Sequence, residues 1–262
     1  MRGHIEGVTR VQQEVRQMIT KIGLFHFVEN YDQPICSLRG ALSECSKDVR
    51  DSLIVLPEAF NYGRSYSQDP YKESKLTQVE AANELAVLSR DHGVTFVVGL
   101  LDPPRNSAYL VRGLGEPVLM RHKRTEDSTN TGGACHPKWW RPCEADYGSN
   151  PYICEGACIG VLICNEMDCC ASASWLAQEL DQRAGTMRKV ICIPAHMANG
   201  HLEGPSGFAP WLGKYVVFAN SRKWPDGSRS FIANRSGQWA PEPGQLGRFV
   251  LKTWDELDSL SK

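Results

Sequence analysis

Short, almost wholly apolar runs recur along the chain and alternate with stretches in which apolar residues return every three or four positions. An apolar run of four to eight residues predicts a buried strand, whereas the longer spacing predicts a helix with one face in the core. Strands are therefore expected at 21–28, 52–56, 94–100, 106–112, 116–122, 159–163, 189–194, 216–219, 230–233 and 248–251, with a hairpin partner for 230–233 within 239–244. Helices are expected at 35–49, 75–92 and 170–184.

The order of these elements predicts the fold class. Strands and helices alternate through the first two-thirds of the chain, which is typical of an α/β protein with a layered sheet. The chain has no internal repeat, low-complexity tract or linker rich in proline and serine. We expect a polar N-terminal lead-in at 1–20 and a single domain at 21–262. Residues 124–150 are polar and without periodicity, and long loops of this kind are often functional.

Charge and cysteine content narrow the class of protein. The net charge is −1, from 29 basic and 30 acidic residues spread along the chain, so no nucleic-acid or membrane surface is indicated. No run approaches the ~18 apolar residues that span a bilayer. The first twenty residues lack the apolar core of a signal peptide, so we read the ten cysteines as reduced thiols of a cytoplasmic protein.

Zinc binding is an alternative use for some of these cysteines. Cys154 with Cys158, and Cys135-His136 with Cys143, are the closest approaches to ligand spacing. Neither has the tightly paired spacing of structural zinc sites. We therefore expect neither a metal nor a cofactor.

Three polar residues each lie just beyond the end of a predicted buried strand. Glu58 follows LIVLP, Lys123 follows VLMRH, and Cys164 follows IGVLI. Because the carboxyl ends of strands meet at one edge of a layered sheet, residues this far apart in sequence can converge there. Each alone has a plainer interpretation: buried cysteines are usually inert, and basic residues are usually solvated.

Together, the three residue types suit nucleophilic catalysis. A cysteine thiol is mostly protonated at neutral pH and needs a base to form the nucleophilic thiolate. A neighbouring carboxylate can serve as that base, and an ammonium group can stabilise the thiolate and the oxyanion that follows attack on a carbonyl or nitrile. The backbone N–H of Asn165, directly after the cysteine, is a second candidate oxyanion donor.

At the level of motifs, the sequence resembles the nitrilase, or carbon–nitrogen hydrolase, superfamily. The segments LIVLPEAF, RHK and GVLICNEMD are similar to its Glu, Lys and Cys motifs and occur in the same order. Later segments (VICIPAH, YVVFANSR and GSRSFIANRSGQWA) also resemble the family, so the likeness extends over nearly the whole chain.

This resemblance implies a four-layer α-β-β-α sandwich that pairs with a second copy through its helices. It implies a thioester acyl-enzyme on Cys164, with Glu58 as general base and Lys123 as oxyanion stabiliser. Many members carry a second glutamate between the Lys and Cys motifs, and Glu144 is the best match here, followed by Glu126. Trp140 is a further candidate for positioning substrate, although the Trp139-Trp140 pair also suits a packed loop anchor.

The sequence departs from the family beside two of the motifs. The acidic residue two positions after the cysteine is kept as Glu166, a candidate for positioning substrate, but Met-Asp-Cys-Cys follows it where the family often has Arg-Phe-Pro. Arg-Thr-Glu follows Lys123 where a hydrophobic residue is common. Cys169 and Cys170 suit the buried start of a helix, and a disulfide of either with Cys164 would inactivate the nucleophile.

We interpret the chain as a hydrolase of non-peptide carbon–nitrogen bonds that acts on a small amide or N-carbamoyl substrate. A nitrilase or an amine-accepting acyltransferase could use the same three residues. A binding protein that keeps the fold without turnover is the alternative from another class, and the intact trio argues against it. The expected partners are a small-molecule substrate and further copies of this chain.

Overall fold

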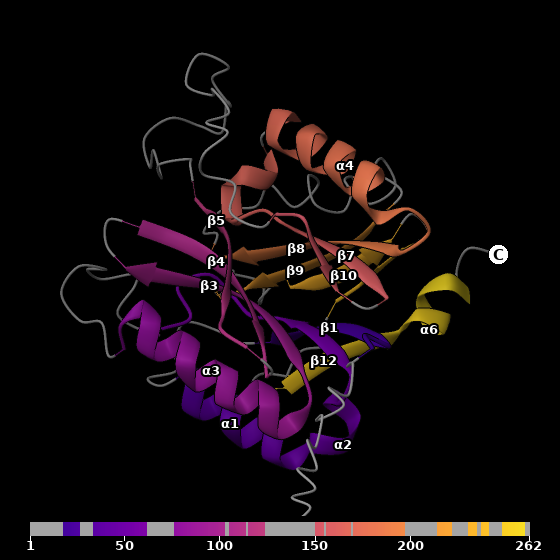
Figure 1. Ribbon diagram of the computed structural model, residues 1–262. Helices are drawn as coiled ribbons and strands as arrows, with labels where there is room; N and C mark the ends of the chain where they lie inside the picture. Colours follow the sequence, from indigo (N-terminus) through magenta and orange to yellow (C-terminus); the bar gives the residue numbers. More distant parts are fainter. Residues whose placement is uncertain are drawn as a thin grey trace, which may run out of the picture.

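A computed structural model gives the fold of this protein and describes residues 18–26, 34–61, 76–102, 105–113, 115–123, 150–154, 156–168, 170–196, 214–221, 230–234, 237–240 and 248–259. Two six-stranded sheets lie face to face, with helices on the outer face of each (Figure 1). The predicted α-β-β-α sandwich is confirmed.

The first sheet has the strand order β12-β1-β2-β3-β4-β5. Its strands are β1 (Lys21–His26), β2 (Ser52–Val55), β3 (Thr95–Asp102), β4 (Arg105–Arg112), β5 (Val118–His122) and β12 (Arg248–Thr253). Strands β1, β2 and β3 are parallel neighbours, and β3, β4 and β5 form an antiparallel meander. Strands β2 and β5 therefore end at the same edge of the sheet.

The second sheet has the order β11-β10-β9-β8-β7-β6. Its strands are β6 (Tyr152–Cys154), β7 (Ala157–Val161), β8 (Arg188–Ala195), β9 (Tyr215–Asn220), β10 (Phe231–Asn234) and β11 (Gly237–Trp239). The three central strands β7, β8 and β9 are parallel and buried, which explains their nearly continuous apolar sequences. Their carboxyl ends form one edge.

Helices cover the two outer faces (Figure 1). The first sheet is covered by α1 (Pro34–Glu44), α2 (Ser46–Val49) and α3 (Gln78–His92), and the second by α4 (Cys170–Ala184). Helix α3 begins with a capping box between Thr77 and Glu80 and ends at Gly93, which has the left-handed φ of 64° typical of a helix C-terminus. No helix in the described part of the chain is both long and apolar enough to cross a bilayer.

The space between the sheets is filled by aliphatic side chains that alternate along the strands. Leu53, Val55 and Val97 of the first sheet belong to the same core as Val190 and Val217 of the second. A second core lies between the first sheet and helices α1 and α3. The sheets also share a backbone hydrogen bond at the edge where β2 and β8 end, from the N–H of Glu58 to the carbonyl of Ala195 at 3.4 Å.

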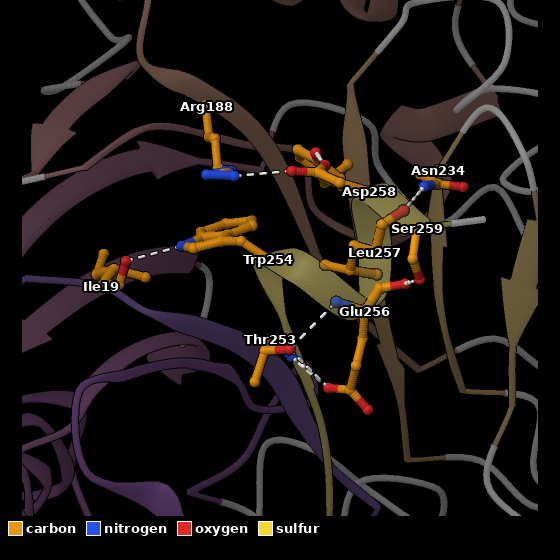
Figure 2. Close-up of polar contacts among 10 residues, drawn as sticks. Ile19, Arg188, Asn234, Thr253, Trp254, Glu256, Leu257, Asp258 and Ser259 are labelled. Carbon is orange, nitrogen blue, oxygen red and sulfur yellow. Dashed lines mark hydrogen bonds and ion pairs between the residues drawn. The ribbon is translucent and has the colours of Figure 1, made fainter. Parts of the chain in front are cut away.

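A short C-terminal helix, α6 (Trp254–Ser259), joins the two sheets (Figure 2). The indole N–H of Trp254 donates to the carbonyl of Ile19 at 2.8 Å, and the Arg188 guanidinium lies over the indole ring at 4.9 Å. Arg188 also pairs with Asp258 at 2.7 Å, and the Asn234 side chain donates to the Leu257 carbonyl. We call these contacts the C-terminal clasp.

Most predicted elements are present, with shifts at their ends. The expected helix at 35–49 is two helices, α1 and α2, that break at Cys45. The expected strand at 159–163 is β7, which starts and ends two residues earlier. Strand β6 and helix α6 were not predicted, because three and six residues are too few to establish a period. Residue 19 of the predicted lead-in is buried against the core.

Candidate active site

Cys164 begins a short 3-10 helix, η3 (Cys164–Asp168), and two residues separate it from the end of strand β7 of the second sheet. Its φ of 52° is in the left-handed region, which non-glycine residues seldom adopt. Such strained residues cluster at functional sites, where the surrounding structure holds them in place. Cys164 is 4% exposed, so its thiol lies inside the protein rather than on its surface.

Glu58 reaches the same place from the first sheet. It follows β2 after Leu56 and Pro57, and its carboxylate is fully buried. One oxygen, Oε1, accepts hydrogen bonds from Lys123 Nζ at 2.8 Å and from Asn106 Nδ2 at 2.5 Å. The other, Oε2, is buried and accepts no hydrogen bond from a nitrogen or oxygen donor among the residues that the structure describes. The two oxygens are therefore chemically distinct.

Lys123 is placed by the meander of the first sheet. It directly follows β5, and its backbone N–H donates to the Asn106 carbonyl at 2.7 Å. Asn106 thus holds Lys123 by its backbone and Glu58 by its side chain. The Lys123 side chain is 6% exposed, so its ion pair with Glu58 is almost fully desolvated.

The environment of Cys164 favours the neutral thiol at rest. Burial raises its pKa well above the usual value, and the charge of Glu58 and a hydrogen bond to that carboxylate raise it further. The charge of Lys123 and a hydrogen bond from the backbone N–H of His196 act in the opposite direction. The side chains of Glu58, Lys123 and Cys164, which the sequence predicts to converge, therefore lie close enough to interact electrostatically.

His196 and Ser221 border the site from the next two strands. His196 follows β8 and Ser221 follows β9, so both lie at the same sheet edge as Cys164. His196 Nδ1 and Ser221 Oγ are 2.7 Å apart, which fixes the imidazole ring.

Comparison with known families agrees with this geometry. The family model for carbon-nitrogen hydrolases matches residues 28–179, which is more than half of the chain. The chain belongs to the carbon–nitrogen hydrolase family. A search of curated protein sequences gave no significant match.

Solved structures of an amidase from Nesterenkonia sp. AN1 share this fold. The enzyme superposes with a TM-score of 0.61 at 18% identity, covering 95% of this chain and 94% of that one. A cysteine-to-alanine variant, described as an amidase from the nitrilase superfamily, gives 0.60 at 18% identity, with 94% of each chain covered. A glutamate-to-glutamine variant with acrylamide added to its active-site cysteine gives 0.60 at 18% identity, with 88% and 92% covered. At this identity the likeness concerns the fold.

Several predicted residues of this carbon–nitrogen hydrolase lie outside the described part of the structure. They are Glu144, Glu126 and Trp140, together with the zinc alternatives Cys135, His136 and Cys143, and Cys169. Cys154 and Cys158, the other zinc alternative, are buried in β6 and β7. No cluster of three metal-ligating side chains is found among the residues that the structure describes.

Glu166 has protein partners on both carboxylate oxygens. Oε1 accepts from Arg121 Nη2 at 2.8 Å, and Oε2 accepts from the backbone N–H of Ile163 at 2.8 Å. A direct contact of Glu166 with substrate stays a prediction.

Sequence reasoning missed Asn106, Arg121 and the backbone of His196. Arg121 could have been found from strand alternation, because it lies two residues before Lys123 and so faces the same side of the sheet. Asn106 could have been found from the predicted hairpin, which places the start of one strand opposite the end of the next. The His196 contact gave no sequence signal, because any residue supplies a backbone N–H.

Proposed function

We propose that this chain hydrolyses a small amide or N-carbamoyl compound through a thioester formed on Cys164. Glu58 is the general base, and Lys123 and the backbone N–H of Asn165 stabilise the oxyanion. The observation that carries the proposal is the state of the Glu58 carboxylate: two donors hold Oε1, Oε2 has no nitrogen or oxygen donor in the described structure, and the carboxylate interacts electrostatically with the buried Cys164 thiol.

The first half of the reaction forms the acyl-enzyme. Glu58 Oε2 takes the thiol proton as Cys164 Sγ bonds to the carbonyl carbon, and the carbonyl oxygen becomes an oxyanion beside Lys123. When this intermediate collapses, the carbon–nitrogen bond breaks, and the proton on Glu58 passes to the leaving nitrogen. Ammonia or an amine departs, and the acyl group stays on sulfur.

The second half reverses these roles with water. Glu58 accepts a proton from a water molecule that attacks the thioester carbon, and a second oxyanion forms at the same place. Collapse breaks the carbon–sulfur bond and releases the carboxylic acid, while the proton returns to the Cys164 sulfur. Glu58 and Lys123 end in the state in which they began.

The buried ion pair supports this division of labour. Because Lys123 is held within 2.8 Å of Glu58 and is almost fully buried, its charge acts in a region of low dielectric, where oxyanion stabilisation is strongest. The similar amidase has been observed in complex with butyramide and with acrylamide. We extend the class of small amides to this chain as a proposal.

The test is mass spectrometry of the intact protein after incubation with small aliphatic amides, N-carbamoyl amino acids and nitriles, alongside an assay for released ammonia. We expect an acyl adduct on Cys164 and ammonia release that is lost in Cys164→Ala. Cys36→Ala, which changes an exposed cysteine of α1, is the matched control and should retain both signals. Full activity in Cys164→Ala would overturn the proposal.

A further inference from the structure

A second buried ion pair lies next to the catalytic one. Arg121 of β5 and Glu166 of η3 are 2.8 Å apart, and each side chain is 1% exposed. The pair crosses from the first sheet to the second. Burying two charges carries a large desolvation cost, so a fully buried pair is weak evidence of added stability and calls for another explanation.

Glu166 closes the turn that contains Cys164. Its Oε2 accepts from the Ile163 N–H at 2.8 Å, and its own backbone N–H donates to the Ile163 carbonyl at 3.1 Å. These bonds flank Cys164 on both sides in sequence. Because Cys164 has a φ of 52°, the turn needs such contacts to hold a backbone conformation that is otherwise unfavourable.

Arg121 is connected in the same way to the other side of the site. Arg121 and Lys123 are two residues apart at the end of β5, so their side chains leave the same face of the sheet. Lys123 contacts Glu58 and acts on Cys164, while Arg121 contacts Glu166. Arg121 and Lys123 are two residues apart, and so are Glu166 and Cys164. One pair of side chains on the first sheet therefore faces one pair of residues on the second.

Arg121 also helps to hold the end of strand β7. Arg121 Nη1 donates to the Val161 carbonyl at 3.3 Å, and Asn150 bonds both the N–H and the carbonyl of Val161 at 2.9 Å. The backbone on which Cys164 sits is therefore held by side chains from three separate segments.

We propose that Arg121 and Glu166 are positioning residues that set the register between Lys123 and Cys164 and hold the nucleophile turn in its strained conformation. This inference rests on the proposed function, because it assigns the pair to the alignment of that reaction. It also gives Glu166 a different role from contact with substrate.

Two variants separate alignment from stability. Glu166→Gln keeps the size of the side chain and an acceptor for Ile163, but leaves Arg121 without its counter-charge. The double variant Arg121→Met/Glu166→Gln removes both buried charges, so it should regain the thermal stability that the single variant loses. Leu180→Ala, a core change in α4, is the control for destabilisation that leaves these contacts in place.

The first measurement is kcat and KM for an amide substrate, together with the melting temperature. Misplacement of a reacting group by about 1 Å can cost roughly 100-fold in rate. We therefore expect kcat to fall about 100-fold in both Glu166 variants, with little change in KM. Leu180→Ala should lower the melting temperature without this loss of kcat. Wild-type kcat in the double variant would overturn the inference.

The second measurement needs no substrate and so distinguishes failure of this inference from failure of the proposed function. It is the pH dependence of Cys164 alkylation by iodoacetamide, followed by peptide mass spectrometry. Loosening the turn relaxes the burial and the contact with Glu58 that favour the neutral thiol, so the profile should move to lower pH in both Glu166 variants and stay unchanged in Leu180→Ala. If the wild-type protein turns over no amide, the proposed function fails, and this profile alone decides: an unchanged profile in the variants overturns the inference.

Discussion

The two carboxylate oxygens of Glu58 have different surroundings. Oε1 is held by Lys123 and Asn106, and Oε2 has no nitrogen or oxygen donor among the described residues; in the proposed reaction, Oε2 is the oxygen that exchanges a proton with sulfur. A base that is anchored through one oxygen needs no rearrangement before it accepts a proton on the other. The ion pair with Lys123 and the hydrogen bond from Asn106 offset the cost of burying this carboxylate, since a buried anion is tolerated when it is paired and hydrogen-bonded.

Replacing Glu58 should lower turnover but make Cys164 more reactive toward alkylation at a given pH. Glu58→Gln removes the base, so kcat should fall by at least about 100-fold. The charge of Glu58 raises the pKa of Cys164, and its removal therefore lowers that pKa and increases the thiolate fraction at a given pH. Alkylation of Cys164 by iodoacetamide should accordingly reach its half-maximal rate at a lower pH.

Asp181→Asn is the control for this experiment, because it removes an exposed carboxylate that pairs with Lys189 and Lys214. It should change neither kcat nor the alkylation profile. A shift of the Glu58→Gln profile to higher pH would contradict the electrostatic account of the site.

Sequence reasoning located the three polar residues that follow strands. It did not locate the residues whose side chains hold those three in place. Glu58, Lys123 and Cys164 each follow an apolar run, and a polar residue in that place is conspicuous. Asn106 and Arg121 lie within strands, where one polar side chain among many carries no signal until the pairing register is known. The predicted convergence of the trio is present in the structure, whereas its catalytic role is a proposal.

At the scale of elements, strand β3 has a glycine where the site needs space. A Cβ on Gly99 would lie 2.8 Å from the Cα of Glu58 and 3.2 Å from the Cβ of Pro194. The first distance involves backbone, which cannot move aside as a flexible side chain can. Glycine at this position therefore allows the segment that carries Glu58 to pack directly on β3.

Gly99→Ala should displace Glu58 from Lys123 and Cys164. We expect a loss of at least about 10-fold in kcat/KM, because small shifts of a reacting group are costly. Gly40→Ala is the matched control: Gly40 lies in helix α1 with no atom within 4 Å of a Cβ, so the change should leave the rate unaltered and raise stability by about 0.5–1 kcal/mol. An unaltered rate in Gly99→Ala would show that Glu58 tolerates the displacement.

The elements differ in how well the sequence predicts them. Helices α3 and α4 have clear periodicity, and α3 also has start and stop signals at Thr77 and Gly93. Strands β6 and β11 have three residues each and acquire their conformation from a neighbouring strand. Pairing between distant segments is not visible in a local pattern, so such elements cannot be predicted from period alone.

At the scale of the whole molecule, the C-terminal clasp connects both sheets through Trp254. The indole packs in the core between the sheets and bonds to Ile19, while Arg188 of the second sheet covers its face. Pairing of two copies through their helices, which the family resemblance implies, stays a prediction.

Trp254→Ala should destabilise the protein by about 3–5 kcal/mol, as is typical for loss of a buried aromatic side chain. Trp254→Phe keeps most of the packing but removes the bond to Ile19, and should cost about 1–2 kcal/mol. Urea denaturation measures both values. Val79→Ala, at a position 69% exposed on α3, should stay within about 0.5 kcal/mol of the wild type. A near-zero effect of Trp254→Ala would mean that the clasp is not part of the cooperative fold.

The two sheets contribute unequally to the site: Glu58 and Lys123 come from one, and Cys164 from the other. Under the proposed mechanism, a chain in which a single sheet has formed therefore has either a base without a nucleophile or a cysteine without its base. Such a chain would not hydrolyse amides. In a cell, newly made or partly unfolded copies would then consume no substrate. The measured activity would be proportional to the number of molecules in which both sheets have formed.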